Sequence, residues 1–432
     1  MVTAIVIAFC IGYLCIALES VLKVDKAVPA LLMCVVCWTL FSIGYAPEQD
    51  IDTSARLIHH LGDTCEILFF LMGAMTIVEI VDANDGFFFV KDAMATTSKR
   101  SLLWRITAMA FLLSAILDNL TTSIVMVMVL SKLIEDKNDR MIYGAMIVIA
   151  ANAGGAFSPI GDVTTIMLWI KGMITASGVI KEVFLPSFVA VVVCGLITQM
   201  YLKGTLPKAA HNPHSFLSRE DSDHLLMLFL GVGGLVFVPI FKMLTGLPPF
   251  MGILLALGLI WLVSEYRCNH NSKYCPEGKL KVTAIMRRID LSTIMFFLGI
   301  LMSVASLQET GVLNSFGIWL NNVSDGNHYL VTGVIGVVSS IVDNVPLVAG
   351  CMDMYSIAAA GDFGVDGMFW QLLAYCAGVG GSMLIIGSAA GVVVMGFEKI
   401  SFGWYMRKFS WIALLGYVAG IATYYLETLL IP

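Results

Sequence analysis

The chain has 432 residues, of which 58% are hydrophobic and only 13% are charged, and its mean hydropathy is +0.87. A soluble domain would carry about 25% charged residues, so this composition excludes a soluble globular protein. The formal net charge of −6 gives no basic surface, and we expect no nucleic-acid partner. Many apolar segments reach the roughly 20 residues that a helix needs to cross a bilayer, which predicts an all-α polytopic membrane protein surrounded by lipid.

The first half of the chain predicts five spans and one hairpin, in the apolar segments 2–20, 27–46, 61–81, 102–133, 140–175 and 183–203. Segment 102–133 is too long for one ordinary span and has Asp118-Asn119 at its centre, so we expect a re-entrant hairpin with this pair at its tip. Segment 140–175 is interrupted near 152–162 and predicts a broken helix. The amphipathic stretch 86–91 predicts a helix lying along the membrane interface.

A polar linker at 204–223 separates this half from a second half with the same plan, which we expect in the segments 225–245, 249–265, 289–308, 312–323 (interfacial), 329–357 (hairpin), 367–397 (broken) and 409–430. We therefore divide the chain into a first repeat at 1–203, a linker at 204–223 and a second repeat at 224–432. Each repeat would have five spans, one of them broken, and a re-entrant hairpin. The whole chain would then have about ten transmembrane helices and two hairpins.

Matching motifs support this duplication. The pair Asp118-Asn119 recurs as Asp343-Asn344, and Gly154-Gly155 recurs as Gly380-Gly381 at nearly the same offset. Because each repeat crosses the membrane an odd number of times, the second repeat would be inverted relative to the first.

The basic residues predict the orientation. With the loop 266–288 in the cytoplasm, the alternation of spans leaves only four of the 25 Lys and Arg residues outside: Arg56, Lys171, Lys181 and Lys242. This bias follows the positive-inside rule. Both termini would then lie on the outer side.

Polar residues gather at the two hairpins and the breaks. An acid in hydrocarbon is costly and usually marks an ion or substrate pathway, so Asp118, Asp162 and Asp343 are the first candidates. Oxygen-bearing neighbours and one acid early in a span complete the candidate set: Ser114, Asn119, Thr121, Asn152, Thr164, Ser339, Asn344 and Glu66. The second break offers Ser382 and Ser388, and because Ser388 stands where the first break has Asp162, the two half-sites are predicted to be unequal.

Oxygen ligands with carboxylates suit hard cations such as Na⁺ or Li⁺. A carboxylate in a dry site favours its neutral form, so the same group can hold either a proton or a metal cation. Mutual exclusion at one carboxylate is enough for exchange of Na⁺ against H⁺. No cofactor is expected beyond these transported ions.

Structural alternatives remain for several of these residues. The Asp-Asn pairs and Asp162 could be helix N-caps, and Glu66 could extend its carboxylate to the membrane surface. The pair His59-His60 is expected in a solvated outer loop. Cys268 and Cys275 lie near His270 and could hold zinc, although no second ligand pair is close in sequence.

Three motifs resemble the NhaD-type sodium/proton antiporters of the ion transporter superfamily: Leu117-Asp118-Asn119-Leu120-Thr121-Thr122, the run from Ala151 to Thr165, and Val342-Asp343-Asn344-Val345-Pro346. The resemblance implies exchange of Na⁺, often also Li⁺, for H⁺ in a bacterial inner membrane, by a homodimer. It also implies that the cation sites are formed by Ser114, Asp118, Asn119, Asn152, Asp162, Thr164, Ser339, Asp343 and Asn344, with Na⁺ at Asp118, Asn119, Asn152, Asp162 and Asp343.

Two other transport functions compete with this interpretation. A sodium-coupled carboxylate or anion symporter can use the same fold, but acids at both tips would repel a dianion, and no Lys or Arg is expected nearby to bind one. A metalloid efflux carrier would fit Cys376 near the second break, yet the first half has no matching residue. The sequence shows no nucleotide-binding loop, metal-hydrolase motif or catalytic triad, so an enzyme is not expected.

Overall fold

A computed structural model describes residues 1–17, 22–49, 51–84, 86, 94, 96–202, 204–205, 219–270, 281–341 and 344–430. These residues are nearly all helical, and the extended pairing among them is an isolated bridge between Ser98 and Thr205. Eight of their helices are long and apolar enough to cross a membrane, at Ala27–Tyr45, Thr53–Ala83, Lys99–Leu117, Ala176–Thr198, Leu225–Thr245, Pro249–His270, Leu291–Glu309 and Ser410–Leu430. The prediction of an all-α polytopic membrane protein is confirmed.

The helices of the first half are α1 (Val2–Ala17), α3 (Ala27–Leu40, extended by the π-helical turn η1, Phe41–Tyr45), α4 (Thr53–Ala83), α6 (Lys99–Leu117), α7 (Asn119–Leu133), α8 (Lys137–Ala156), α9 (Val163–Ile170) and α10 (Ala176–Thr198). The predicted hairpin is α6 and α7, which meet at Asp118, and the predicted break lies between α8 and α9. The predicted interfacial stretch 86–91 lies almost wholly outside the described residues.

The second half contains α11 (Arg219–Thr245), α12 (Pro249–His270), α13 (Val282–Ile285), α14 (Leu291–Glu309), α15 (Val312–Val323), α16 (His328–Ser339), α17 (Asn344–Met354), α18 (Met368–Gly380), α19 (Ala389–Glu398), α20 (Phe402–Lys408) and α21 (Ser410–Leu430). The second hairpin (α16 and α17) and the second broken span (α18 and α19) lie where they were predicted. The short helix α20 was not predicted.

Two helices begin earlier than the predicted spans. Helix α11 begins at Arg219, inside the predicted linker 204–223, while its part that can cross a membrane, Leu225–Thr245, agrees with the predicted span 225–245. Helix α4 begins at Thr53, because Asp52 caps it by accepting hydrogen bonds from the N–H groups of the next turn. His59 and His60 therefore lie within α4 and not in an outer loop, and His60 is 2.8 Å from Oε1 of Glu309.

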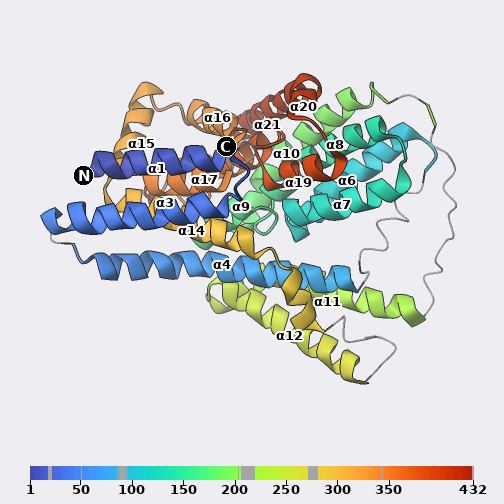
Figure 1. Ribbon diagram of the computed structural model, residues 1–432. Helices are drawn as coiled ribbons and strands as arrows, with labels where there is room; N and C mark the ends of the chain where they lie inside the picture. The colour runs from blue at the N-terminus through green and yellow to red at the C-terminus, as the bar shows by residue number, and fades with distance from the viewer. Residues whose placement is uncertain are drawn as a thin grey trace.

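Helix contacts come in matched pairs. Helix α3 packs on α14 and α12 packs on α4, while α7 packs on α19 and α17 packs on α9. Helix α10 contacts α21, and α8 contacts α18. Exchanging each element for its counterpart in the other half reproduces the same contacts. In Figure 1 the hairpin of α6 and α7 extends to the right of the centre, whereas α16 and α17 lie to the left.

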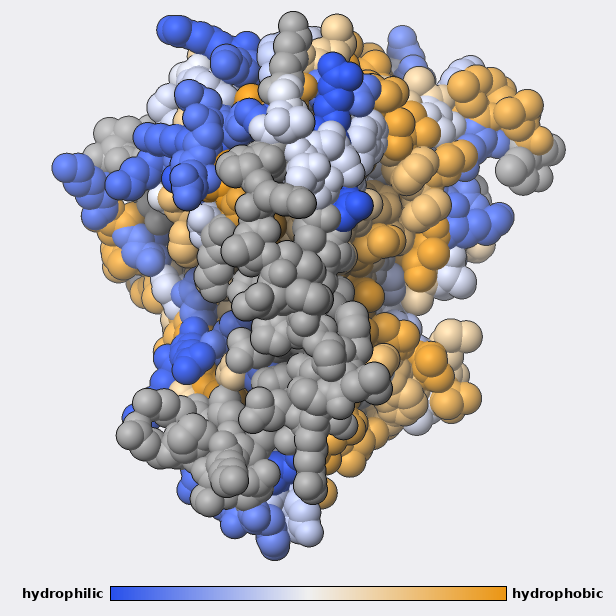
Figure 2. Space-filling model, turned by 90° about the vertical axis from the view of Figure 1, so that its right-hand side faces the viewer, coloured by the Kyte–Doolittle hydropathy of each residue, from blue (hydrophilic) through white to orange (hydrophobic). Residues whose placement is uncertain are grey.

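The two ends of the bundle differ in charge. We call one the basic end, where α3, α6, α8 and α14 begin, with ion pairs such as Lys99–Asp139 and Arg288–Glu79. The opposite end, where α4, α10, α16 and α18 begin, is called the acidic end, and it carries Asp63, Glu182, Glu309, Asp353, Asp362 and Asp366. Figure 2 looks onto the basic end, where hydrophilic residues gather along the top and left and hydrophobic residues line the right-hand edge.

Candidate functional site

The centre of the candidate site is Asp162, which is only 1% exposed. It follows the Ser158-Pro159 turn that ends α8, where proline removes a backbone donor, and it caps the next helix, α9. Its Oδ1 accepts hydrogen bonds from the N–H of Thr164 at 2.9 Å and from the Thr164 hydroxyl at 2.7 Å. The cap interpretation of Asp162 is thus correct locally, but it uses only one of the two carboxylate oxygens.

Both hairpin tips converge on this carboxylate. Asn119, at the start of α7, donates from Nδ2 to Oδ2 of Asp162 at 2.7 Å and to Oδ1 of Asn152 at 3.1 Å. Asn344, at the start of α17, donates from Nδ2 to both oxygens of Asp162 at 3.4 Å. All four side chains are buried. One carboxylate is therefore shared by two hairpins that lie far apart in the sequence.

Asn152 links this group to the second break. Its Nδ2 donates to the hydroxyl oxygens of Ser382 at 3.0 Å and Ser388 at 2.8 Å, which lie on either side of the break between α18 and α19. The two serines belong to the buried polar network with Asp162, although the sequence offered them only as residues of the second break, outside the main candidate set. Their signal was their position in the repeat, since Ser388 is the counterpart of Asp162.

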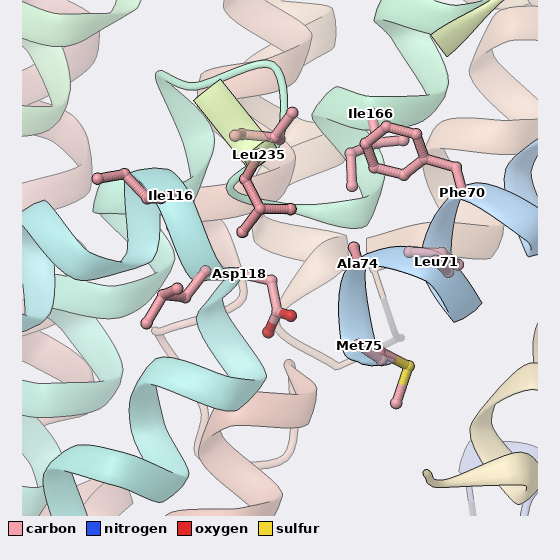
Figure 3. A pocket seen from close by; sticks show the side chains of 10 residues that line it. Phe70, Leu71, Ala74, Met75, Ile116, Asp118, Ile166 and Leu235 are labelled. Atoms are coloured by element: carbon pink, nitrogen blue, oxygen red, sulfur yellow. The ribbon is translucent and has the colours of Figure 1, made fainter. Parts of the chain in front are cut away.

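Asp118 occupies the tip of the first hairpin in an unusual backbone conformation, with φ 83° and ψ 159°. This region is essentially restricted to glycine, so the fold must hold Asp118 there against strain. Its carboxylate turns back to cap α7, accepting from the N–H of Thr121 at 2.7 Å and from the Thr121 hydroxyl at 3.0 Å. In Figure 3 it faces Leu71, Ala74 and Met75 of α4 across a small apolar hollow.

The other predicted site residues divide into two groups. Ser114 donates to the carbonyl of Ala151, and Ser339 donates to the carbonyl of Ala377 at 2.9 Å. These hydroxyls therefore fasten each hairpin arm to the helix that precedes each break. Glu66 lies near Lys242, towards the acidic end, and does not line the cavity described below. Asp343 lies outside the described residues.

A cavity connects the polar centre with the basic end. Its polar lining is Asp118, Asn119, Thr121, Asp162 and Asn344, and it extends past Phe297 to Thr293 and Lys26, where α14 and α3 begin. The expectation that no Lys or Arg lies near the tips is wrong for Lys26, whose Nζ sits 4.3 Å from the ring centroid of Phe296. The sequence did not indicate Lys26, because it precedes α3 and lies far along the chain from both hairpin tips.

The lining suits a hard monovalent cation. Carboxylate, amide and hydroxyl oxygens are the groups that such ions prefer, and the described residues contain no group of three His, Cys, Asp or Glu side chains that could hold a metal ion. Of the zinc alternative, Cys268 and His270 lie near the end of α12, and Cys275 lies outside the described residues.

Comparison with known proteins agrees with this geometry. The citrate transporter family model (CitMHS) matches residues 13–373. Sodium/proton antiporter 1 of Arabidopsis thaliana is 47% identical over 98% of this chain and 72% of its own length. The Na(+)/H(+) antiporter NhaD of Vibrio parahaemolyticus is 31% identical over 91% of this chain and 97% of its own.

The fold also has a counterpart among solved structures. The crystal structure of the Alcanivorax borkumensis YdaH transporter, described as having an unusual topology, matches with a TM-score of 0.62 at 12% identity, covering 94% of this chain and 98% of that one. The fold is therefore that of a multi-span membrane transporter. The chain belongs to the citrate transporter family and is a relative of the NhaD-type sodium/proton antiporters, which confirms the family that its motifs resemble.

Proposed function

We propose that the protein exchanges Na⁺ for H⁺ across a membrane and that Asp162 is the carboxylate at which the two ions compete. One observation carries the proposal: the buried Asp162 is held at once by Asn119 and Asn344, from the tips of two separate hairpins. A carboxylate placed between two hairpins can change its access from one side of the membrane to the other when they move. Relatives named sodium/proton antiporters support the choice of ions.

The amide groups suggest how a cation would bind. Asn119 and Asn344 now direct N–H groups at Asp162. Rotation of each amide would present its carbonyl oxygen instead, so that Na⁺ or Li⁺ could sit between the carboxylate and the amide oxygens. When the cation leaves, a proton on Asp162 restores neutrality. A bare carboxylate is poorly tolerated away from water, so the empty charged site would cross slowly and the two fluxes would be coupled.

The rest of the cation site follows from position. We assign Asp118, Asn119, Asn152 and Asp343 to the same Na⁺-binding set, because Asp118 and Asn119 line the cavity with Asp162, Asn152 bonds to Asn119, and Asp343 precedes Asn344. Ser114, Thr121, Thr164 and Ser339 shape the tips and helix starts. Glu66, which lies towards the acidic end, is assigned only to the entrance on that side.

The proposal includes an inverted arrangement of repeats 1–203 and 224–432. The exchanged helix contacts and the opposite directions of the hairpins in Figure 1 support it. By the positive-inside rule the basic end would face the cytoplasm, so the cavity at Asp162 would be open inwards and both termini would lie outside. We place the protein, as a homodimer, in a bacterial inner membrane, which is what its resemblance to the NhaD-type antiporters implies.

The family description and Lys26 favour one second candidate, a sodium-coupled carboxylate symporter. Lys26 lines the cavity and could pair with an anionic substrate, and the matching family model is that of a citrate transporter. Asp118 and Asp162 in the same cavity argue against a dianion.

Purified protein in proteoliposomes separates the two functions. With an imposed pH gradient, addition of Na⁺ or Li⁺ should dissipate the gradient, and Asp162→Asn should abolish the response. In parallel, uptake of labelled citrate driven by a Na⁺ gradient should stay at the level of empty liposomes. Citrate uptake without Na⁺-dependent proton movement would replace the antiporter proposal with the symporter.

A further inference from the structure

Two lysines fasten the end of α9 to its neighbours at the acidic end. Lys171, which directly follows α9, donates from Nζ to Oδ2 of Asp63 on α4. Lys242 of α11 donates in the opposite direction, to the carbonyl of Trp169 at 2.9 Å, and lies 4.7 Å from the centroid of its ring. Both lysines belong to the four basic residues that break the charge bias of the chain. These two exceptions are thus used in contacts between helices.

Packed side chains block the route between these contacts and the site. Asp63, Phe70 and Ala74 are spaced by seven and four residues, which places them on one face of α4. Ala74 lines the hollow beside Asp118 (Figure 3), and Phe70 meets the ring of Trp169 edge-on at 6.4 Å. At 1.5 Å per residue, Asp63 lies about 16 Å further along the helix than Ala74. An apolar layer and then an ionic layer therefore separate the site from the acidic end.

The basic end has the same parts in an open arrangement. Asp290 lies six residues before Phe296-Phe297, as Asp63 lies six residues before Phe69-Phe70. Because Gly73 matches Gly299 in the repeat, Phe297 is the counterpart of Leu71, the neighbour of Phe70, and it lines the cavity. Asp290 accepts hydrogen bonds from the N–H and the hydroxyl of Thr293.

A lysine is also present at the matching helix end. Lys399 directly follows α19, as Lys171 directly follows α9, and its side chain is exposed. Each repeat thus has an Asp and a Lys at similar places, although Asp290 lies one residue and Lys399 two residues beyond the exact repeat positions of Asp63 and Lys171.

We propose that Asp63–Lys171, supported by Lys242, is a latch that closes the acidic-end entrance in this state, and that Asp290 and Lys399 form the matching latch at the basic end when the site faces the other way. This inference rests on the proposed exchange and on the inverted repeats. Neither latch binds the transported ion. Their relative strength sets how often the site faces each side. Ion pairs as exposed as Lys171–Asp63 shift an equilibrium by only about two- to fivefold, so the latch can release in every cycle.

The experiment measures access to the site directly. Ala74→Cys is introduced, a membrane-impermeant maleimide is added from one side or the other of oriented membranes, and modification of residue 74 is read by peptide mass spectrometry. Lys171→Gln should raise the labelling rate from the acidic end about two- to fivefold. The charge exchange Asp63→Lys with Lys171→Asp re-forms the ion pair and should return the labelling rate to that of Ala74→Cys alone. The matched control is Lys181→Gln, an exposed lysine at the same end whose ion pair is with its neighbour Glu182 on α10.

The matching latch makes an opposite prediction. Lys399→Gln should favour the state shown here and raise labelling from the basic end. An unchanged labelling rate in Lys171→Gln or an equal change in Lys181→Gln would overturn the inference. So would a change of labelling from the acidic end that has the same direction in Lys171→Gln and Lys399→Gln. Labelling does not depend on which ion is carried. If labelling responds while the Na⁺ response in proteoliposomes is absent, the latch stands and the proposed exchange fails; the reverse result removes the latch alone.

Discussion

The two broken helices perform the same local task with different chemistry. Asp162 begins α9 with φ −146° and ψ 142°, and Ser388 begins α19 with φ −149° and ψ 154°. Each caps its helix, Asp162 through Thr164 and Ser388 through the N–H of Gly391 at 3.2 Å. A neutral hydroxyl is therefore sufficient for the cap, and capping does not explain the acid. The amides of Asn119 and Asn344 both bond to Asp162, in the half that has the acid. The difference between Asp162 and Ser388 is therefore what makes ion exchange possible.

The largest expected effect comes from making the two breaks alike. Asp162→Ser copies Ser388, keeps a capping oxygen and removes the carboxylate. We expect Na⁺-dependent proton movement in proteoliposomes to fall at least about a hundredfold, since the cation and the proton lose their shared ligand. The melting temperature should change little, because Ser and Asp are similar N-caps. Retained exchange would show that Asp162 is only a cap.

The two hairpin tips should contribute unequally to Na⁺ binding, and the tip whose asparagine lies closer to Asp162 should contribute more. Asn119 lies 2.7 Å from the carboxylate of Asp162 and Asn344 lies 3.4 Å from it. The closer amide is better placed to turn its oxygen towards a cation at Asp162, so Asn119→Ala, which removes that ligand, should lower the apparent Na⁺ affinity by roughly tenfold or more. Asn344→Ala should lower it less than tenfold. Measuring the Na⁺ dependence of exchange at fixed pH for both variants decides this, and a larger loss for Asn344→Ala contradicts the inequality of the half-sites.

Adding an acid to the second break, where Ser388 stands in place of an aspartate, is a second test of whether the two half-sites are unequal. Ser388→Asp would place a second carboxylate on Asn152, which already connects to Asp162 through Asn119. Two like charges in a buried network resist ionising together, so the pH of half-maximal exchange should rise by about one unit. Ser388→Asn, which adds similar bulk without charge, is the matched control. An unchanged pH profile in Ser388→Asp would mean that the second break is not coupled to the exchange site.

The sequence predicted the spans and the hairpins because the length of apolar segments and the repeated Asp-Asn pair carry that information directly. It also predicted which residues would gather, since Asn119, Asn152, Asp162 and Asn344 all meet. It did not predict which of them would touch. Asp118 lines the same cavity as Asp162, but a short acidic side chain at a helix start bonds readily to its own backbone, and in this state Asp118 bonds to Thr121.

Two further features depend on packing between distant segments. Lys26 reaches the cavity because α3 packs against α14, which no local pattern in the sequence reveals. Helix α20 has only seven residues, too few for a periodic signal. The same packing explains why the repeat is strict where backbones cross: a Cβ at Gly154 would overlap the carbonyl of Phe111, and one at Gly380 would overlap the carbonyl of Gly336.

These glycines should respond alike, in contrast to the two breaks. Gly154→Ala and Gly380→Ala each force a shift between backbones, which costs about 1–3 kcal/mol. We expect both variants to lower the melting temperature of the detergent-solubilised protein by similar amounts. Gly396→Ala, where an added Cβ meets nothing within 4 Å, should not destabilise it. A large loss at only one of the two glycines would contradict the equivalence of the crossings.

The smallest effect on Na⁺ affinity is expected at Ser382, a residue of the second half that only helps to orient Asn152 of the first half. Its hydroxyl accepts one of two hydrogen bonds from Asn152, and the other goes to Ser388. A neutral hydrogen bond contributes about 1 kcal/mol, so Ser382→Ala should lower the apparent Na⁺ affinity by no more than roughly fivefold. The double variant Ser382→Ala with Ser388→Ala should lower it by more than the product of the single effects, because Asn152 then loses every partner that holds its amide in the second break and can rotate away from Asn119. Simple multiplication of the two effects would mean that the serines do not orient Asn152, and the link between the halves would then be packing alone.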